Sequence, residues 1–228
     1  MSREVPPATE MFNLACATRE ACRKYPTAAT TPTEPAAVSL LAVAALQIQT
    51  AQVGARMADM SNDGTRTQTL EAIATDYEGV SGAALNLSIR CSVSVVDLCA
   101  AALGRLCGRN KSLTHEWGAK NALGAFDKTP ASITDPLLSL IDPYLKRLRS
   151  TDWASTSFLR NEVTHKAFVR GITGTFEQSP QPRPMAWPEQ LEFKWGSDMV
   201  PLDQLSETVV RVAVDTFREF CTNLIALA

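Results

Sequence analysis

Two long stretches without proline constrain the fold of this chain more than any other feature. One runs from Pro35 to about Met60 and is rich in Ala, Leu and Gln, and the other runs from Thr67 to Leu106. Apolar residues of the second stretch recur every three or four positions, as on one face of an α-helix. They are Leu85, Ile89, Val93, Val96 and Leu103. We therefore predict two long helices in an all-α protein.

Helix start and stop signals predict two shorter helices, one before these stretches and one after them. Thr9 follows two prolines as an N-cap, and residues 9–25 are predicted as a single helix that Pro26 ends. Asp135-Pro136 pairs an N-cap with proline at the first helical position and opens a helix over 135–149. We expect Asp142-Pro143 to restart or kink that helix.

The last third of the chain mixes helix and strand patterns. Ser150-Thr151-Asp152 offers a cap for a helix that runs to about Arg170. Residues 173–177 and 191–195 alternate polar and apolar side chains around a Pro-rich connection, which predicts two short strands forming a hairpin. Residues 201–227 carry the pattern of an amphipathic closing helix.

Length and composition favour one domain over two. The chain has 228 residues, of which 45% are hydrophobic and 20% charged, as in an ordinary soluble protein. Its longest apolar stretch, Ala36 to Leu46, is far shorter than the roughly 20 residues of a membrane span, and the N-terminus lacks the pattern of a secretory signal. We expect a cytoplasmic protein without membrane association. We expect a single domain, 1–228, that forms an antiparallel helical bundle with a hairpin or loop insertion at about 172–200.

The six cysteines show no metal-binding pattern. No two of them form a CxxC pair, and the two histidines are far from all of them in sequence. Buried, reduced thiols in a cytosolic protein are the simplest interpretation. We therefore expect neither a metal nor another cofactor.

Positive charge gathers in one part of a slightly acidic chain. The net charge of −2 argues against a surface built as a whole to hold nucleic acid. Between residues 146 and 170, six basic residues stand against Asp152 and Glu162, a local balance of +4. The basic residues are Lys146, Arg147, Arg149, Arg160, Lys166 and Arg170. We predict that Lys146, Arg147, Arg149 and Lys166 contact an RNA backbone, the alternative being an ordinary solvated face.

A polar cluster on the helix predicted over 150–170 is the main candidate site. At 100° per residue, Thr164 lies about 40° from Arg160, Asn161 about 100° and His165 about 140°. Arg160 pairs with Thr164 and Asn161 with His165 at i,i+4 spacing, so their ends can converge on one small ligand. The rest of this helix is apolar nearly all round, which predicts burial against neighbouring elements or a second subunit.

These side chains match one reaction in particular. Histidine exchanges protons near neutral pH, arginine neutralises charge on a phosphoryl group, and asparagine orients either partner. The residue types fit metal-free attack of an RNA 2′-hydroxyl on the adjacent phosphate, with His165 as base or acid, Arg160 on the phosphate and Asn161 in support. One histidine cannot easily serve both sides of the phosphorus, so we predict a symmetric dimer that supplies a second His165.

The run Arg160-Asn161-Glu162-Val163-Thr164-His165 resembles the signature of HEPN domains. That signature is an arginine, a polar residue directly after it, and a histidine four to six positions beyond the arginine. The resemblance implies a helical-bundle dimer with the two motifs facing each other. Many members of the family are metal-independent endoribonucleases of toxin–antitoxin, abortive-infection or CRISPR-linked defence. By the same resemblance, Arg160 and His165 are catalytic, Asn161 supports them, and an antitoxin protein is a further partner.

The resemblance has limits, and other interpretations stay open. Toxins paired with nucleotidyltransferase antitoxins often carry a Tyr two residues after the His, where this chain has Ala167. A non-catalytic helical module that binds RNA, a nucleotide or a partner protein would use the same cleft. A structural alternative is a hydrogen-bond network of Arg160, Asn161 and His165 that pins the helix to its neighbours. His115 lacks the second histidine of a metalloprotease helix and is most simply a surface residue.

Overall fold

The computed structural model describes residues 8–24, 37–62, 77–107, 135–165, 192–195 and 198–228. Within these residues the protein is helical apart from one pair of short strands. The elements, in chain order, are α1 (Ala8–Ala17), α2 (Arg19–Lys24), α3 (Ala37–Asn62), α5 (Tyr77–Leu106), α7 (Asp135–Leu148), α8 (Thr151–His165), β1 (Glu192–Trp195), β2 (Asp198–Pro201) and α10 (Leu202–Ile225). The predicted all-α character is confirmed.

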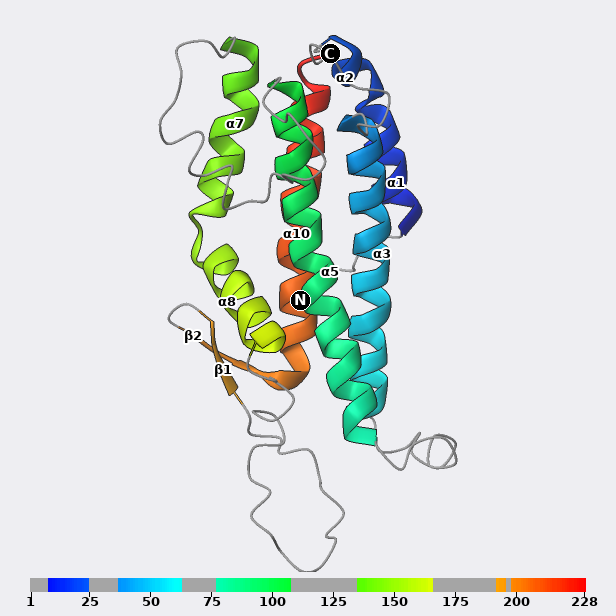
Figure 1. The fold of residues 1–228 in the computed structure, drawn as a ribbon, viewed down its shortest axis with the longest axis vertical. Coiled ribbons are helices and arrows are strands. Elements are labelled where there is room, and N and C mark those ends of the chain that lie inside the picture. Colours follow the sequence, from blue (N-terminus) through cyan, green and yellow to red (C-terminus); the bar gives the residue numbers. More distant parts are fainter. Residues whose placement is uncertain (1–7, 25–36, 63–76, 108–134, 166–191, 196–197) are drawn as a thin grey trace, which may run out of the picture.

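Three long helices form the centre of the molecule. α5 runs antiparallel to α3, and α10 packs against both of them (Figure 1). α1 lies beside α3, whereas α7 and α8 follow one another along the opposite side, next to α5 and α10 (Figure 1). The core between them is built from fully buried aliphatic and aromatic side chains, among them Leu41, Ile48, Leu103, Phe217 and Phe220.

α3 and α5 pack closely because small residues meet at their contact. A Cβ atom placed on Gly54 of α3 would lie 2.8 Å from the backbone oxygen of Ala84 and 3.0 Å from the backbone nitrogen of Ser88. Only glycine allows so close an approach of two helix backbones without a shift. The neighbouring Ala51 and Ala55 are also buried, and so the pair forms a rigid platform.

α7 is fixed to this platform by an aromatic side chain. The Tyr144 hydroxyl donates a hydrogen bond of 2.7 Å to the backbone oxygen of Val96 in α5, and its ring meets that of Phe220 edge-on at 5.5 Å. Arg147 in the last turn of α7 forms an ion pair with Glu219 of α10, with a shortest distance of 2.9 Å. The end of α7 is therefore tied to α10, directly before α8 begins.

Two predictions about helix continuity need correction. The predicted helix 9–25 is two helices, because the turn at buried Thr18 separates α1 from α2. Its hydroxyl donates to the backbone oxygen of Ala15 at 2.6 Å, a local bond that competes with regular helix geometry. Conversely, the helix predicted over 135–149 continues through Pro143 from Asp135 to Leu148, so of the predicted restart or kink the restart does not occur.

The strand pair precedes α10 directly. β1 and β2 are antiparallel, with Glu192 opposite Pro201 and Trp195 opposite Asp198. β1 lies within the strand predicted at 191–195, and its partner is the segment 198–201, for which no strand was predicted. The other predicted strand, 173–177, lies outside the described residues. The closing helix predicted over 201–227 is confirmed as α10, which begins at Leu202.

Two helices are more apolar than the longest uninterrupted apolar run indicates. Ala37–Met57 and Ala84–Leu106 are long and apolar enough to cross a membrane, by length and composition alone. Core helices of soluble proteins pass the same test, and the second segment is mostly buried. Less than half of the first segment is buried, however, so α3 presents much of its apolar surface outward.

Candidate functional site

The candidate site is built on α8, whose start is fixed by a side-chain cap. The Ser150 hydroxyl accepts a hydrogen bond of 3.2 Å from the backbone N–H of Trp153, three residues on. This is the geometry of an N-cap, and Asp152 in the first turn adds a favourable interaction with the helix dipole. The predicted cap is therefore confirmed, and it sets the rotation of every later residue of α8.

One face of α8 packs against the bundle. Trp153, Thr156 and Leu159 are buried on it, and the helix contacts α5, α7, α10 and β1. Arg160 lies seven residues after Trp153, about 20° away around the helix, so it belongs to the same packed face. The arginine is accordingly half-buried rather than free in solvent.

The guanidinium of Arg160 is incompletely satisfied. Its Nε is buried and has no hydrogen-bond partner, and none of the salt bridges found within the described residues involves it. A buried donor of a charged group that has no acceptor loses its hydrogen bond to water without gaining one in the protein, which costs free energy. An anion reaching this nitrogen would supply the missing acceptor.

The opposite face of α8 is open within this chain, so only one side of the helix is buried against neighbouring elements. Ala154 and Asn161 are exposed, and the Phe158 ring is 60% exposed, the largest value among the exposed large hydrophobic side chains of the described residues. α8 extends to His165, and the side chains of residues 162–165 lie outside the described part. That Asn161 and His165 share one face therefore stays a prediction from their four-residue spacing.

Arg160 and Asn161 therefore sit on different sides of α8. The sequence places them about 100° apart, and the structure turns this separation into one residue on the packed face and one on the open face. Convergence of their side chains on one ligand requires that ligand to lie across the edge of the helix. A phosphate with bases on either side is large enough to do so.

The predicted basic residues have different surroundings. Both Nε and Nη2 of Arg147 donate to the same oxygen of Glu219, at 3.2 Å and 2.9 Å, so this arginine is committed to an ion pair. Lys146 and Arg149 are exposed at the end of α7, close to the start of α8. Lys166 lies outside the described residues. Lys146 and Arg149 thus lie before the N-terminal end of α8, and the first residue of α8 is about 14 Å along the helix axis from Arg160.

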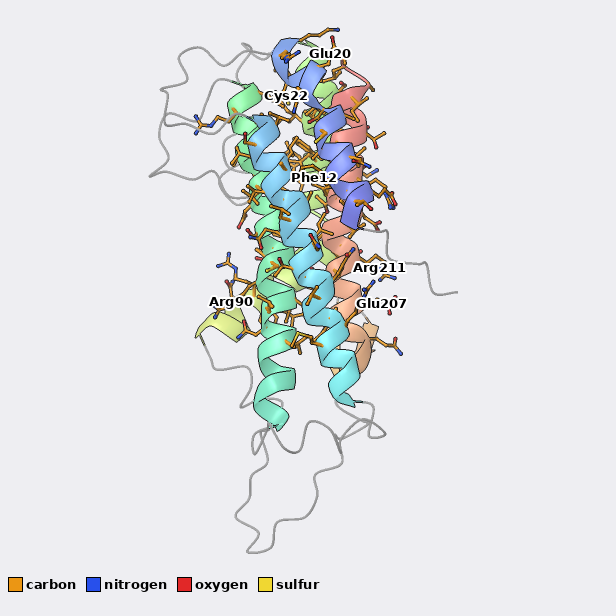
Figure 2. All side chains as sticks on the ribbon, turned by 90° about the vertical axis from the view of Figure 1, so that its right-hand side faces the viewer. Phe12, Glu20, Cys22, Arg90, Glu207 and Arg211 are labelled. Atoms are coloured by element: carbon orange, nitrogen blue, oxygen red, sulfur yellow. The ribbon has the colours of Figure 1, made fainter. Side chains whose placement is uncertain are left out.

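Sequence reasoning missed a further arginine beside α8. Arg90 is exposed on α5 and points to the side on which α8 lies (Figure 2), and the two helices are in contact. One turn earlier, Asn86 has a buried Oδ1 without a hydrogen-bond partner. An arginine 70 positions before Arg160 carries no local signal of this proximity. The two helices in contact, α5 and α8, thus each carry a buried polar atom without a hydrogen-bond partner, and α5 also carries an exposed arginine.

The buried thiols and phenol are inert by comparison. Burial raises the pKa of Cys99 and that of Cys221 well above the ordinary value of 9.0, and it also raises the pKa of Tyr144. Such groups stay protonated at neutral pH and are poor nucleophiles. All six cysteines are free, and among the described side chains no three His, Cys, Asp or Glu residues are grouped to hold a metal ion.

Comparison with known proteins found no matching family model, no matching curated protein and no matching solved structure.

Proposed function

We propose that the protein is a metal-independent endoribonuclease of a toxin–antitoxin or phage-defence type, built on a HEPN-like helical domain. The observation that carries the proposal is the buried, unpartnered Nε of Arg160. It lies on the helix that also carries exposed Asn161 and ends at His165. A charged group without an acceptor, on the same helix as a residue type that exchanges protons, suits the binding and cleavage of a phosphodiester.

The proposed reaction needs two histidines. One His165 removes the proton of a 2′-hydroxyl, the oxygen attacks the adjacent phosphorus, and the bond from phosphorus to the 5′-oxygen breaks. A second His165 donates a proton to that 5′-oxygen, which leaves a 2′,3′-cyclic phosphate and a 5′-hydroxyl. Arg160 stabilises the charge on the phosphoryl oxygens. Two chains meeting through the open face of α8 would supply both histidines.

Further charges would hold the RNA backbone. Exposed Lys146 and Arg149 lie on one side of Arg160 along the chain, and Arg90 lies beside α8 on the neighbouring helix. Lys166 belongs to the same proposed contact, whereas the ion pair with Glu219 leaves Arg147 less available. The proposed setting is the cytoplasm, with an antitoxin protein as a further partner.

A non-catalytic HEPN-like module is the alternative, and one observation favours it. Arg160 lies on the packed face of α8 and Asn161 on the open face, so the two do not converge within one chain. A module of this kind would bind RNA, a nucleotide or a partner protein through Arg160 and Arg90 without cleaving anything. Cleavage therefore separates the two proposals.

The decisive experiment is RNA cleavage by the purified full-length chain in EDTA. We expect wild-type protein to cut single-stranded RNA and to leave 2′,3′-cyclic phosphate ends. Arg160→Ala and His165→Ala should each lower the rate by about 100-fold or more, because each removes a transition-state interaction. Circular dichroism of each variant checks that the helices are retained.

Matched controls make the result specific. Arg211→Ala removes an exposed arginine of α10, on the side of the molecule away from α8 (Figure 2), and His115→Ala removes the other histidine. Both should cut at the wild-type rate. If wild-type protein cuts no better than Arg160→Ala and His165→Ala, the ribonuclease proposal is lost. RNA binding that persists without cleavage would favour the non-catalytic module.

A further inference from the structure

Exposed apolar side chains gather on one side of the molecule, away from α8. Among the described residues, seven large hydrophobic side chains are exposed, and four of them lie on α3. These are Val43 at 43%, Leu46 at 52%, Val53 at 48% and Met57 at 45%. Phe12 of α1, labelled in Figure 2, is also exposed beside this helix. We call the four residues of α3, with Ser39 and Thr50, the α3 seam.

The α3 seam has the spacing of a coiled-coil contact. Its positions 39, 43, 46, 50, 53 and 57 alternate steps of four and three residues, which keeps them on one stripe about 27 Å long. An exposed helix face in water normally carries charged residues. Residues 37–55 contain none, and the first charge on α3 is Arg56. The α3 seam therefore has the residue composition of a helix face that another element covers.

The α3 seam sits on a rigid support. The close approach of Gly54 to Ala84 and Ser88 fixes α3 against α5 along the flank next to the seam. Leu87 of α5 directly precedes Ser88 and is 40% exposed, so it extends the apolar surface onto the neighbouring helix. A preorganised surface loses little conformational freedom when another helix covers it.

We propose that the α3 seam is a self-association surface, covered by the α3 seam of a second copy of this chain in antiparallel orientation. The seam is self-complementary in one register. Val43 then meets Val53 of the second copy, Leu46 meets Thr50, and Met57 meets Ser39, with the same three pairings repeated by symmetry. Each layer joins an aliphatic side chain to a small or apolar one, as an isologous two-fold contact requires.

Charge favours the antiparallel orientation. In this register the two Arg56 residues lie at opposite ends of the paired helices, about 24 Å apart, where their repulsion is screened. A parallel pair would bring the same arginines next to each other and align the two helix dipoles. The uncharged seam of α3 also excludes a strongly charged partner helix, which would lose solvation without gaining an ion pair.

A lipid surface fits the α3 seam less well than a helix does. Helices that lie in a membrane interface combine a broad apolar face with flanking Lys and Arg residues. Here the apolar stripe is bordered by exposed Gln49 and half-buried Gln47, with Arg56 the one basic residue between 37 and 62. This contact does not rest on the ribonuclease proposal, because α3 and α8 lie on opposite sides of α5 (Figure 1).

Light scattering of the full chain over a concentration series tests the contact. We expect Leu46→Glu combined with Val53→Glu to halve the particle mass. Association of this variant would bury two carboxylates in each pair of symmetry-related layers, which is unfavourable. Gln49→Glu places the same charge on α3 outside the seam and should leave the mass unchanged. A wild-type chain that stays monomeric, or a mass that the double variant leaves unchanged, would overturn the proposal.

Disulfide trapping tests the orientation. Val43→Cys combined with Val53→Cys should cross-link two chains on mild oxidation, whereas either substitution alone should not, because identical positions lie about 15 Å apart along an antiparallel pair. Wild-type protein oxidised in parallel controls for its six native cysteines. Cross-linking by Val43→Cys alone would refute the antiparallel register. Flotation of a monomeric wild type with phosphatidylserine vesicles would assign the α3 seam to lipid instead.

Discussion

Arg160 places a charged group on the packed face of α8 without a hydrogen-bond partner for its Nε. Its position on the packed face of α8 removes water from Nε, and none of the hydrogen bonds of the structure reaches that nitrogen. A satisfied structural network would have provided an acceptor. The unsatisfied donor therefore favours a role in ligand binding over the pinning role that the sequence left open.

Replacement of Arg160 by an apolar residue of similar length tests this distinction. We expect Arg160→Met to raise the free energy of unfolding by about 1 kcal/mol, because the variant keeps the packed stem and removes the unpaired donor. Urea denaturation at neutral pH measures the change. The matched control is Arg211→Met, at an exposed position of α10. A loss of stability specific to Arg160→Met would instead support the pinning network.

At the scale of elements, the contact between α3 and α5 determines the shape of the bundle. α3 spans nearly the stretch predicted from Pro35 to about Met60, and α5, whose periodic apolar pattern predicted a helix, ends at Leu106 as expected. The first ten residues of the predicted second helix, 67–76, lie outside the described residues. The pattern did not reveal how close the two helices lie. That closeness depends on Gly54 meeting Ala84 and Ser88, residues 30 or more positions away along the chain.

Substitution of Gly54 should separate these helices. Gly54→Ala places a methyl group 2.8 Å from the backbone oxygen of Ala84, which only a backbone shift can relieve. We expect a net loss of about 1–2 kcal/mol in unfolding free energy, since the packing strain exceeds the gain in helix propensity. Urea denaturation measures it. Gln49→Ala, at an exposed position of the same helix, should have little effect, and equal stability of wild type and Gly54→Ala would contradict the close contact.

At the scale of the whole molecule, buried ionisable groups link stability to alkaline pH. Cys99 of α5, Cys221 of α10 and Tyr144 of α7 belong to one continuous core, and burial raises the pKa of each above its ordinary value. Raised folded-state pKa values favour the protonated forms. Their contribution to stability is complete below the ordinary thiol pKa of 9.0 and is lost as the pH rises beyond it.

Alkaline unfolding is the expected outcome. The urea midpoint should stay nearly constant up to about pH 8.5 and fall above it. The free energy of unfolding then decreases by at most about 1.4 kcal/mol per pH unit for each group. Cys221→Ala should show a shallower decline, because one of the titrating groups is removed. A midpoint that does not move between about pH 7.5 and about pH 10.5 would contradict this coupling.

The sequence by itself determined the helices and much of their boundaries. Proline, the caps at Asp135 and Ser150 and the three- and four-residue apolar spacing act within a few turns, so they can be interpreted without knowledge of the fold. The prediction was wrong at Thr18, where a local hydrogen bond interrupts the helix expected over 9–25, and it missed the strand 198–201 that pairs with β1. The sequence also identified Arg160, Asn161 and His165 as a candidate cluster.

Only the tertiary structure decided how that cluster is presented. The same helix is apolar nearly all round in sequence, yet Trp153 is buried, Phe158 is open and Arg160 is turned toward the bundle. These differences arise from the packing of α8 against α5 and α10, whose residues lie far from α8 along the chain. The position of Arg90 on the side of α5 where α8 lies has the same origin. Local pattern fixes the order of side chains around a helix, whereas its neighbours fix which side faces water.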